Sequence, residues 1–242
     1  MGKTLRGGIG HRTPPRAQQN AAAGVGLPAV VDVERVLPSP TTVSVIVPTA
    51  DRHHRHEGLY NQFQHQDYPD RDLWILDDSG SPSPFFQRLG DSDPRVHYVH
   101  NPHRQPIGCK RNKLIEMSGG ACLAHFDDDD GYSPRYLSSM LSRLRDWDAD
   151  LVKLGVWDER REASPRRSRY RGRSDDDLWG YGFSYVYRRS VAKRVSFPCV
   201  NGGEDFGFIR GMWGAGLKTS LVWDGSDWAY HLLHARNTSR RQ

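Results

Sequence analysis

The chain has 242 residues, enough for one sizeable α/β domain with tails. Its hydrophobic content of 36% and mean hydropathy of −0.73 are polar for this length, and they predict substantial loop-like portions. The formal net charge of +5 favours acidic partners such as nucleotides, nucleic acids or anionic surfaces. Since no stretch approaches the length of an apolar membrane-spanning segment, we expect no membrane span.

Three cysteines, Cys109, Cys122 and Cys199, lie far apart and have no metal-ligand spacing. An odd and sparse set of cysteines argues against a disulfide scaffold and for a reducing compartment. The first twenty residues lack the apolar core of a secretion signal. We therefore expect a cytoplasmic protein, and the sequence leaves its oligomeric state open.

The composition divides the chain into a domain and two tails. Residues 1–40, rich in Gly, Pro, Arg and Gln, predict a flexible N-terminal tail, and residues 238–242 predict a short C-terminal one. Within residues 41–237, apolar runs and helical periodicity alternate. Strands are expected at 43–47, 73–76, 96–99, 121–126, 150–156, 183–187, 217–222 and 229–233, and helices at 53–66, 81–93, 106–117, 133–145, 189–194 and 204–213. This order predicts a single α/β domain with a mainly parallel central sheet and helices on both faces.

Polar side chains follow three of these strands. Thr49 and Asp51 come after the first strand, Asp77 and Asp78 after the second, and residues 127–130, all aspartates, after the fourth. The carboxyl ends of parallel strands share one edge of a sheet, where ligands bind in open α/β folds. We therefore expect one acidic crevice built from three segments.

The run of four aspartates follows a short apolar strand and precedes the helix start at Ser133-Pro134. Adjacent carboxylates repel one another, and a hard divalent cation with oxygen ligands, Mg²⁺ or Mn²⁺, would relieve that repulsion. A solvated acidic turn that caps the next helix explains the same segment equally well. The segment alone leaves both interpretations open.

Residues 159–177 contain seven arginines, then three aspartates, and almost no apolar residue. This composition predicts a mobile basic loop. The loop could bind an acceptor or clamp phosphates, or it could be a solvated insertion. The histidines at positions 53, 54 and 56, set among arginines, predict a solvated helix face.

Four segments, VSVIVPTADR, LWILDDSGS, IGCKRNKLIEMSGGACLAHFDDDDGYSP and GGEDFGFI, occur in the order found in family-2 glycosyltransferases of the GT-A fold. The resemblance covers roughly residues 43–237. It implies a GT-A, Rossmann-like domain that transfers a sugar from a nucleoside-diphosphate donor, usually UDP-linked, with metal dependence and inversion. With a short chain and no membrane segment, the sequence does not resemble a processive polysaccharide synthase.

The resemblance also implies how the donor is bound. Thr49 and Asp51 would lie against the nucleoside, and Asp77 or Asp78 would hydrogen-bond the base. The family more often has Gly-Ser directly after the aspartate pair, so the intervening Ser79 leaves the choice between the two aspartates open. Arg111 would approach the base or the diphosphate.

Asp127 and Asp129 match the Asp-x-Asp motif of the family. By the same resemblance, Asp127 would lie near the ribose and the donor sugar, Asp129 would bind Mn²⁺ or Mg²⁺, and Asp130 would support them, while Asp128 points away. His234 would be a second ligand of the metal or the diphosphate. A metal held there would stabilise the charge that develops on the leaving diphosphate.

Asp205, with Glu204 beside it, matches the general base of the family. Inversion requires a base on the opposite face of the sugar to accept the acceptor proton, and a carboxylate suits that task. The acceptor is left open among peptides, proteins, glycans and nucleic acids.

Two other functions fit parts of the sequence. A nucleotidyltransferase would need a Gly-rich, Lys-containing loop after the first strand, and PTADRHHRH has no glycine. A nucleic-acid-binding module would explain the Arg-rich segment and the net charge. The acidic crevice and the lack of an aromatic-basic stripe oppose that alternative.

Overall fold

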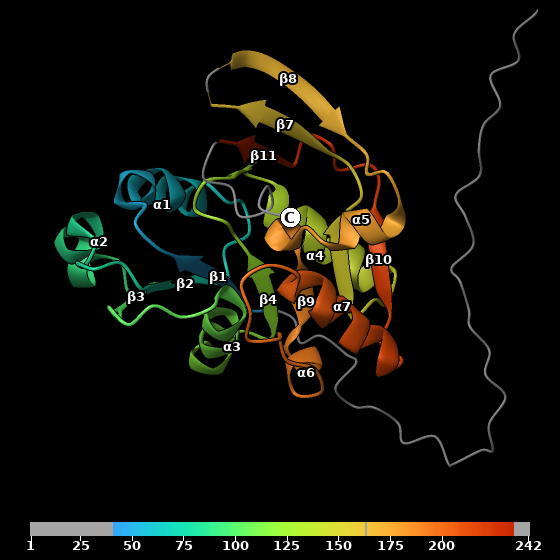
Figure 1. The fold of residues 1–242 in the computed structure, drawn as a ribbon, viewed down its shortest axis with the longest axis horizontal. Coiled ribbons are helices and arrows are strands. Elements are labelled where there is room, and N and C mark those ends of the chain that lie inside the picture. The colour runs from blue at the N-terminus through green and yellow to red at the C-terminus, as the bar shows by residue number, and fades with distance from the viewer. Residues whose placement is uncertain (1–40, 163, 235–242) are drawn as a thin grey trace, which may run out of the picture. The chain divides into compact units, whose positions relative to one another are not determined.

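The computed structural model describes residues 41–162 and 164–234, all of which belong to one compact unit. The tails expected at 1–40 and 238–242 lie outside the described residues. A seven-stranded sheet of order β10-β6-β9-β4-β1-β2-β3 forms the centre, and only β9 runs antiparallel to its neighbours (Figure 1). Its strands are β1 (Val43–Thr49), β2 (Arg71–Asp77), β3 (Val96–His100), β4 (Cys122–His125), β6 (Leu151–Leu154), β9 (Val186–Arg188) and β10 (Thr219–Val222). The expected mainly parallel sheet is confirmed.

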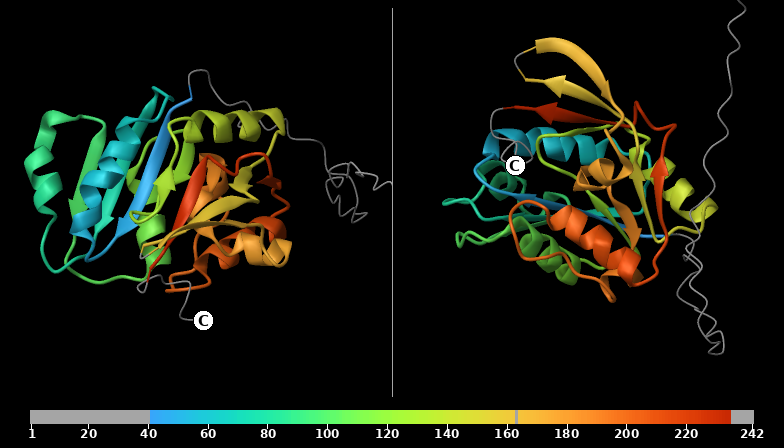
Figure 2. Two further views of the ribbon diagram at one scale, coloured as in Figure 1. Left: turned by 90° about the horizontal axis from the view of Figure 1, so that it is seen from above. Right: turned by 45° about the vertical axis from the view of Figure 1, so that its right-hand side comes forward.

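Helices cover both faces of this sheet because side chains alternate along its strands. Val45 of β1 packs into a core with Leu59 and Met140, whereas the next residue, Ile46, packs into a second core with Phe208. The first core is closed by α1 (His56–Gln64), α2 (Pro84–Leu89) and α4 (Tyr136–Asp146). The second core is closed by α3 (Ile107–Met117), α6 (Arg189–Ala192) and α7 (Glu204–Gly214), and Figure 2 shows the two layers from further sides.

Some boundaries differ from the expected ones. Pro48 does not end β1, because pairing with β4 stops at Ile46 and the missing N–H of the proline faces no partner there. The helix expected from Ser133 begins at Tyr136, after the two-residue strand β5 (Gly131–Tyr132). The strand expected at 183–187 begins at Val186, preceded by a 3₁₀ turn at Gly182–Ser184.

The Arg-rich segment is not a loop. Residues Trp157–Arg161 (β7) and Ser164–Tyr170 (β8) form a hairpin, followed by helix α5 (Asp175–Trp179). With β5 and β11 (Ala229–Leu233) the hairpin makes a second, four-stranded sheet of order β5-β11-β7-β8, at the top of Figure 1. Trp157 pairs with Tyr170 across the hairpin, and both rings pack against Tyr181. Two aromatic residues at the base of the hairpin therefore anchor strands whose other positions are polar.

A disulfide joins Cys109 of α3 to Cys199, whereas Cys122 is a free, buried thiol in β4. The expectation that the cysteines form no bridge is therefore wrong. The two bonded residues lie 90 positions apart, so no local spacing pointed to the pair. The bridge removes the cysteine-based argument for a reducing compartment. Among the described helices, none has the length and apolar character needed to cross a membrane.

Candidate functional site

The three polar strand ends meet at one edge of the central sheet, together with the starts of α3 and α7. The hydroxyl of Thr49, the last residue of β1, donates to Asp128, which follows β4. Lys110 of α3 donates to the Thr49 carbonyl at 3.0 Å and to Asp78 after β2 at 2.9 Å. These contacts bring together the segments that the sequence placed in one acidic crevice.

The segment after β1 carries two contacts that the sequence did not indicate. His56 is fully buried, with Nε2 3.1 Å from Oγ1 of Thr49 and Nδ1 2.7 Å from Oγ of Ser83. Burial lowers the pKa of His56, so this histidine is a structural residue rather than part of a solvated face. Arg52 donates to Asp128 at 2.7 Å and to Asp129 at 2.8 Å. Arg52 follows Asp51 directly, and its position after a strand end was the one available signal.

The two aspartates at the end of β2, Asp77 within the strand and Asp78 just after it, face different neighbours. Asp77 accepts hydrogen bonds from the backbone N–H of Ser79 at 2.9 Å and from the Tyr98 hydroxyl of β3 at 2.7 Å. Although burial alone would raise the pKa of Asp77, these bonds lower it overall. Asp78 instead faces α3, where it accepts from Lys110 and, at 2.9 Å, from the backbone N–H of Gln105.

Helix α3 turns two charged residues inward. Lys110 and Arg111 are buried beside Leu114, while the apolar Met117 is 37% exposed. Both side chains find carboxylates there, as buried charges require. Lys110 links the ends of β1 and β2, and burial lowers its pKa.

Arg111 lies beneath the catalytic carboxylates that the resemblance implies. Its Nη1 donates to Oε1 of Glu204 at 2.7 Å and also contacts Asp205, and its Nη2 is 3.9 Å from Oδ1 of Asp127. The side chain is 2% exposed. We expected Arg111 to approach the base or the diphosphate. In the structure its guanidinium binds the carboxylates of α7.

Asp205 is held close to the backbone. Its Oδ2 accepts from the N–H of Gly182 at 2.9 Å, and a Cβ on that glycine would lie 2.2 Å from Oδ1. A side chain at position 182 would therefore displace the carboxylate. Burial raises the pKa of Asp205 to about 7, against the opposing effect of Arg111. A carboxylate with such a pKa is suited to proton transfer near neutrality.

The aspartate run supplies a group of three carboxylates. One oxygen from each of Asp127, Asp129 and Asp130 lies within 4.8 Å of the others. Burial raises the pKa of all three, that of Asp127 to about 6. Oxygen-only donors crowded in this way fit a hard divalent cation, which would relieve their mutual repulsion. Asp128 turns away from this group toward Thr49 and Arg52, in line with its expected orientation.

Two late histidines hold this group in place. Nε2 of His234 lies 2.6 Å from Oδ2 of Asp129, so the late histidine reaches the corner where it was expected. Nδ1 of His231 lies 2.9 Å from Oδ1 of Asp130, which also accepts from the backbone N–H of Leu232 at 2.9 Å. Burial would lower the pKa of His231, but Asp130 raises it to about 9. His231 was missed in the sequence, although its place in an alternating strand put it on the inner face.

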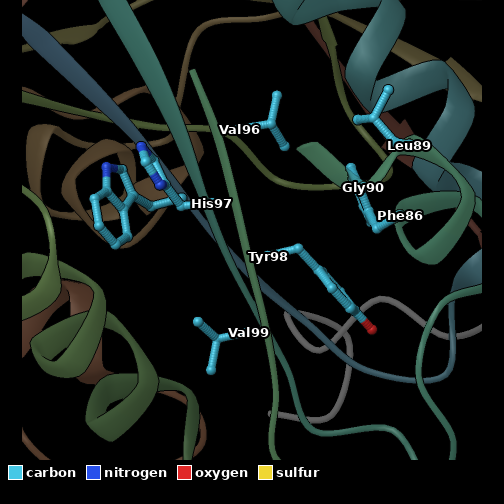
Figure 3. A pocket seen from close by; sticks show the side chains of 8 residues that line it. Phe86, Leu89, Gly90, Val96, His97, Tyr98 and Val99 are labelled. Atoms are coloured by element: carbon cyan, nitrogen blue, oxygen red, sulfur yellow. The ribbon is translucent and has the colours of Figure 1, made fainter. Parts of the chain in front are cut away.

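A separate pocket of about 390 Å³ lies along β3 (Figure 3). Its lining comes from β2, β3 and the end of α2, and consists of apolar and aromatic groups with the His97 imidazole. The carboxylates described above do not line it. The acidic crevice, rather than this pocket, therefore has the chemistry of a reaction site.

Comparisons with known proteins agree with this geometry. A model of glycosyl transferase family 2 matches residues 44–202. The GalNAc(5)-diNAcBac-PP-undecaprenol beta-1,3-glucosyltransferase of Campylobacter jejuni is 31% identical over 107 residues, which make up 43% of this chain and 35% of that protein. The chain spans only 35% to 40% of the length of such curated relatives.

Two solved structures share the fold. S. aureus TarS 1–349 in complex with UDP-GlcNAc superposes with a TM-score of 0.69 at 16% identity, covering 83% of this chain and 61% of that one. The mannosyltransferase PcManGT from Pyrobaculum calidifontis, in complex with GDP-Man and Mn²⁺, superposes with a TM-score of 0.65 at 18% identity, covering 82% and 59%. The expected GT-A fold is thereby confirmed.

Proposed function

The chain belongs to glycosyl transferase family 2, and on that premise we propose that it transfers a sugar from a nucleoside-diphosphate donor to an acceptor nucleophile with inversion. One observation carries the proposal. The buried guanidinium of Arg111 contacts Asp205 and lies 3.9 Å from Asp127. It therefore lies between the carboxylate suited to proton transfer and the carboxylate group suited to a divalent cation. That juxtaposition suits a reaction in which one group leaves as a diphosphate while a proton is removed nearby.

The donor nucleoside would lie against the end of β1, at Thr49 and Asp51. Between the two aspartates at the end of β2, we assign the base contact to Asp78, because Lys110 and Arg104 link it to the end of β1, whereas Asp77 faces β3. We favour a UDP-sugar. The structural neighbours were solved with UDP-GlcNAc and with GDP-Man, so the base is a point for experiment.

Asp127 and Asp129, with His234 beside Asp129, would hold Mn²⁺ or Mg²⁺. The bound ion would supply positive charge to the leaving diphosphate. Asp130 is a supporting residue, because His231 and the Leu232 N–H already occupy its oxygens. Arg52 contacts the same oxygen of Asp129 as His234 does and adds a cation at this corner.

Asp205 would accept the proton of the acceptor. Its place in the first turn of α7 favours the ionised form, as does Arg111, whereas burial opposes it. The balance leaves a base that is ionised only in part at neutral pH. Glu204 shares Arg111 and orients it.

Calorimetry with UDP and Mn²⁺, repeated in EDTA, tests the donor site. We expect binding that depends on the metal, and a screen of nucleotide sugars should then reveal metal-dependent donor hydrolysis. A matched titration with DNA or RNA covers the alternative of a nucleic-acid-binding module. Salt-sensitive binding of nucleic acid without any binding of UDP, GDP or another nucleoside diphosphate would overturn the proposal.

A further inference from the structure

The four-stranded sheet has an outer face that the proposed reaction does not use. Register places Tyr230 of β11 beside Asp158 of β7, and Arg160 of β7 opposite Arg167 of β8. Since side chains alternate along strands, these residues share one face, whereas His231, which holds Asp130, lies on the other. On the outer face they line a cavity of about 270 Å³ together with Gly131, Ser133 and Asp227.

Stacking fixes the Arg160 side chain at this cavity. Its guanidinium carbon lies 3.6 Å from the centre of the Tyr230 ring. That ring in turn packs on Gly131, where a Cβ would lie 1.9 Å from a ring carbon, so only glycine fits. Stacking occupies the face of the guanidinium and leaves its N–H groups, which lie in the plane, free to donate.

The two arginines are not neutralised by acids. Among residues 41–162 and 164–234, neither Arg160 nor Arg167 forms an ion pair, and the buried Nε of Arg160 has no hydrogen-bond partner. The acids of the lining are already engaged, since Asp158 pairs with Arg169 at 3.5 Å and Asp227 pairs with Arg135. Like charges directly opposite on neighbouring strands destabilise a sheet, and an anion between them would reverse that effect.

We propose that Arg160 and Arg167 form a binding site for a phosphate group on the outer face of the four-stranded sheet, separate from the donor site. Guanidinium groups recognise phosphate oxygens through paired N–H donors. The Tyr230 ring gives the cavity an aromatic wall, which suits a phosphate attached to an organic group. The phosphate could belong to a free ion or to a phosphorylated organic molecule, and the two sources differ in affinity.

Calorimetry in EDTA tests the site. EDTA removes divalent cations, so phosphate cannot bind through a metal at the proposed donor site, and the remaining binding reports on the arginines. The probes are inorganic phosphate and phenyl phosphate. We expect one site on the wild-type protein, weakened by salt. Tighter binding of phenyl phosphate identifies a phosphorylated organic ligand, and equal binding identifies the free ion.

The test variant is R160Q/R167Q, and the matched control is R166Q/R171Q, which removes the same charge from exposed arginines of the same segment. We expect the test variant to weaken phosphate binding about tenfold or more, and the control to change it about twofold or less. UDP binding with Mn²⁺ should be unchanged in both, which separates this site from the proposed donor site. Equal losses in the two variants, or no phosphate binding by the wild-type protein, would overturn the proposal.

Discussion

Arg111 donates from Nη1 to Oε1 of Glu204 across 2.7 Å, in a position where the guanidinium is almost fully buried. The same nitrogen contacts Asp205, so one cation serves two neighbouring carboxylates. Breaking a buried ion pair leaves an uncompensated charge, which costs far more than the pair itself contributes. This arrangement makes the charge state of Asp205 depend on Arg111, and the first three predictions follow from it.

Asp205→Asn should abolish most of the sugar transfer while donor binding survives. The amide keeps the shape of the side chain but cannot accept a proton, and general-base catalysis is worth about 10²- to 10⁴-fold in rate. We expect a loss of that size in kcat with little change in the Kd for UDP and metal. The isosteric control is Glu204→Gln, for which we expect a smaller loss because, in the proposed mechanism, Glu204 acts only through its contact with Arg111. Transfer by the Asp205 variant at the wild-type rate would exclude Asp205 as the base.

The rate of transfer should rise with pH through about 7. The pKa of Asp205 is raised to about 7 by burial, and the base must be ionised to accept the acceptor proton. Below that pH the protonated form accumulates, so kcat should fall about tenfold for each pH unit. Donor-saturated initial rates between pH 5.5 and about 9 measure this limb. A profile that stays flat through pH 6 would show that another group limits the reaction.

Arg111→Met should destabilise the protein, and the loss should grow as the pH rises. Removal of the guanidinium leaves Glu204 and Asp205 without a counter-ion. When both are ionised, this should lower the free energy of unfolding by about 3 to 5 kcal/mol. At lower pH protonation relieves part of that cost. Urea unfolding at pH 5.5 and about 8 measures the trend, with Arg111→Lys as the control that keeps the charge. A pH-independent loss would mean that the effect arises from packing alone.

The strands could be predicted because their apolar runs are continuous. The acidic edge of the sheet could be predicted because the acids lie at strand ends. The side of a helix on which a charged side chain lies was harder to predict. Lys110 and Arg111 look like solvated residues of α3, yet both side chains are buried, because they bind carboxylates that are distant in the sequence. The same holds for His56, which fills a buried position between Thr49 and Ser83.

The β7–β8 hairpin shows why composition misled. Trp157 and Tyr170 pack on aromatic neighbours at the base of the hairpin, and the arginines between them, of which Arg160 stacks on Tyr230, give the segment the polar composition of a loop. Strand pairing with β11, from a segment some 70 residues away along the chain, supplies what the local sequence lacks. Long-range pairing of this kind leaves no periodic signal, and the pairing of Cys109 with Cys199 leaves none either.

Removing the disulfide should lower stability. The bridge closes a loop of 90 residues and ties the start of α3 to the segment before α7. In the chain-entropy account, a loop of this length is worth about 4 to 5 kcal/mol. Cys109→Ser/Cys199→Ser should therefore unfold at lower urea, and the oxidised wild-type protein should shift toward it when a dithiol reductant is added. Cys122→Ser is unsuitable as a control because it is buried, so the reduced wild-type protein serves instead. Equal midpoints for oxidised, reduced and variant protein would show that the bridge adds no stability.

Lys153 of β6 is fully buried, with Nζ 4.4 Å from the centre of the Trp157 ring and a single hydrogen bond to the Leu154 carbonyl at 3.0 Å. Burial lowers its pKa to about 7, whereas the unfolded chain holds that proton up to the ordinary value of 10.5. The native state therefore loses stability from this group below pH 7, and the loss shrinks as the pH rises from 7 toward 10.5.

Lys153→Met should consequently stabilise the protein at pH 7 by about 1 to 3 kcal/mol, after allowance for the lost hydrogen bond. The gain should be smaller at pH 9.5, because between pH 7 and 10.5 the native lysine is neutral while the unfolded one still binds its proton, so raising the pH favours the native state. Urea unfolding at both pH values measures the difference, and Lys218→Met, which removes a half-exposed lysine paired with Asp148, provides the control. A variant that is less stable than the wild-type protein by the same amount at both pH values would show that the aromatic contacts of Lys153 outweigh the cost of burying its amine.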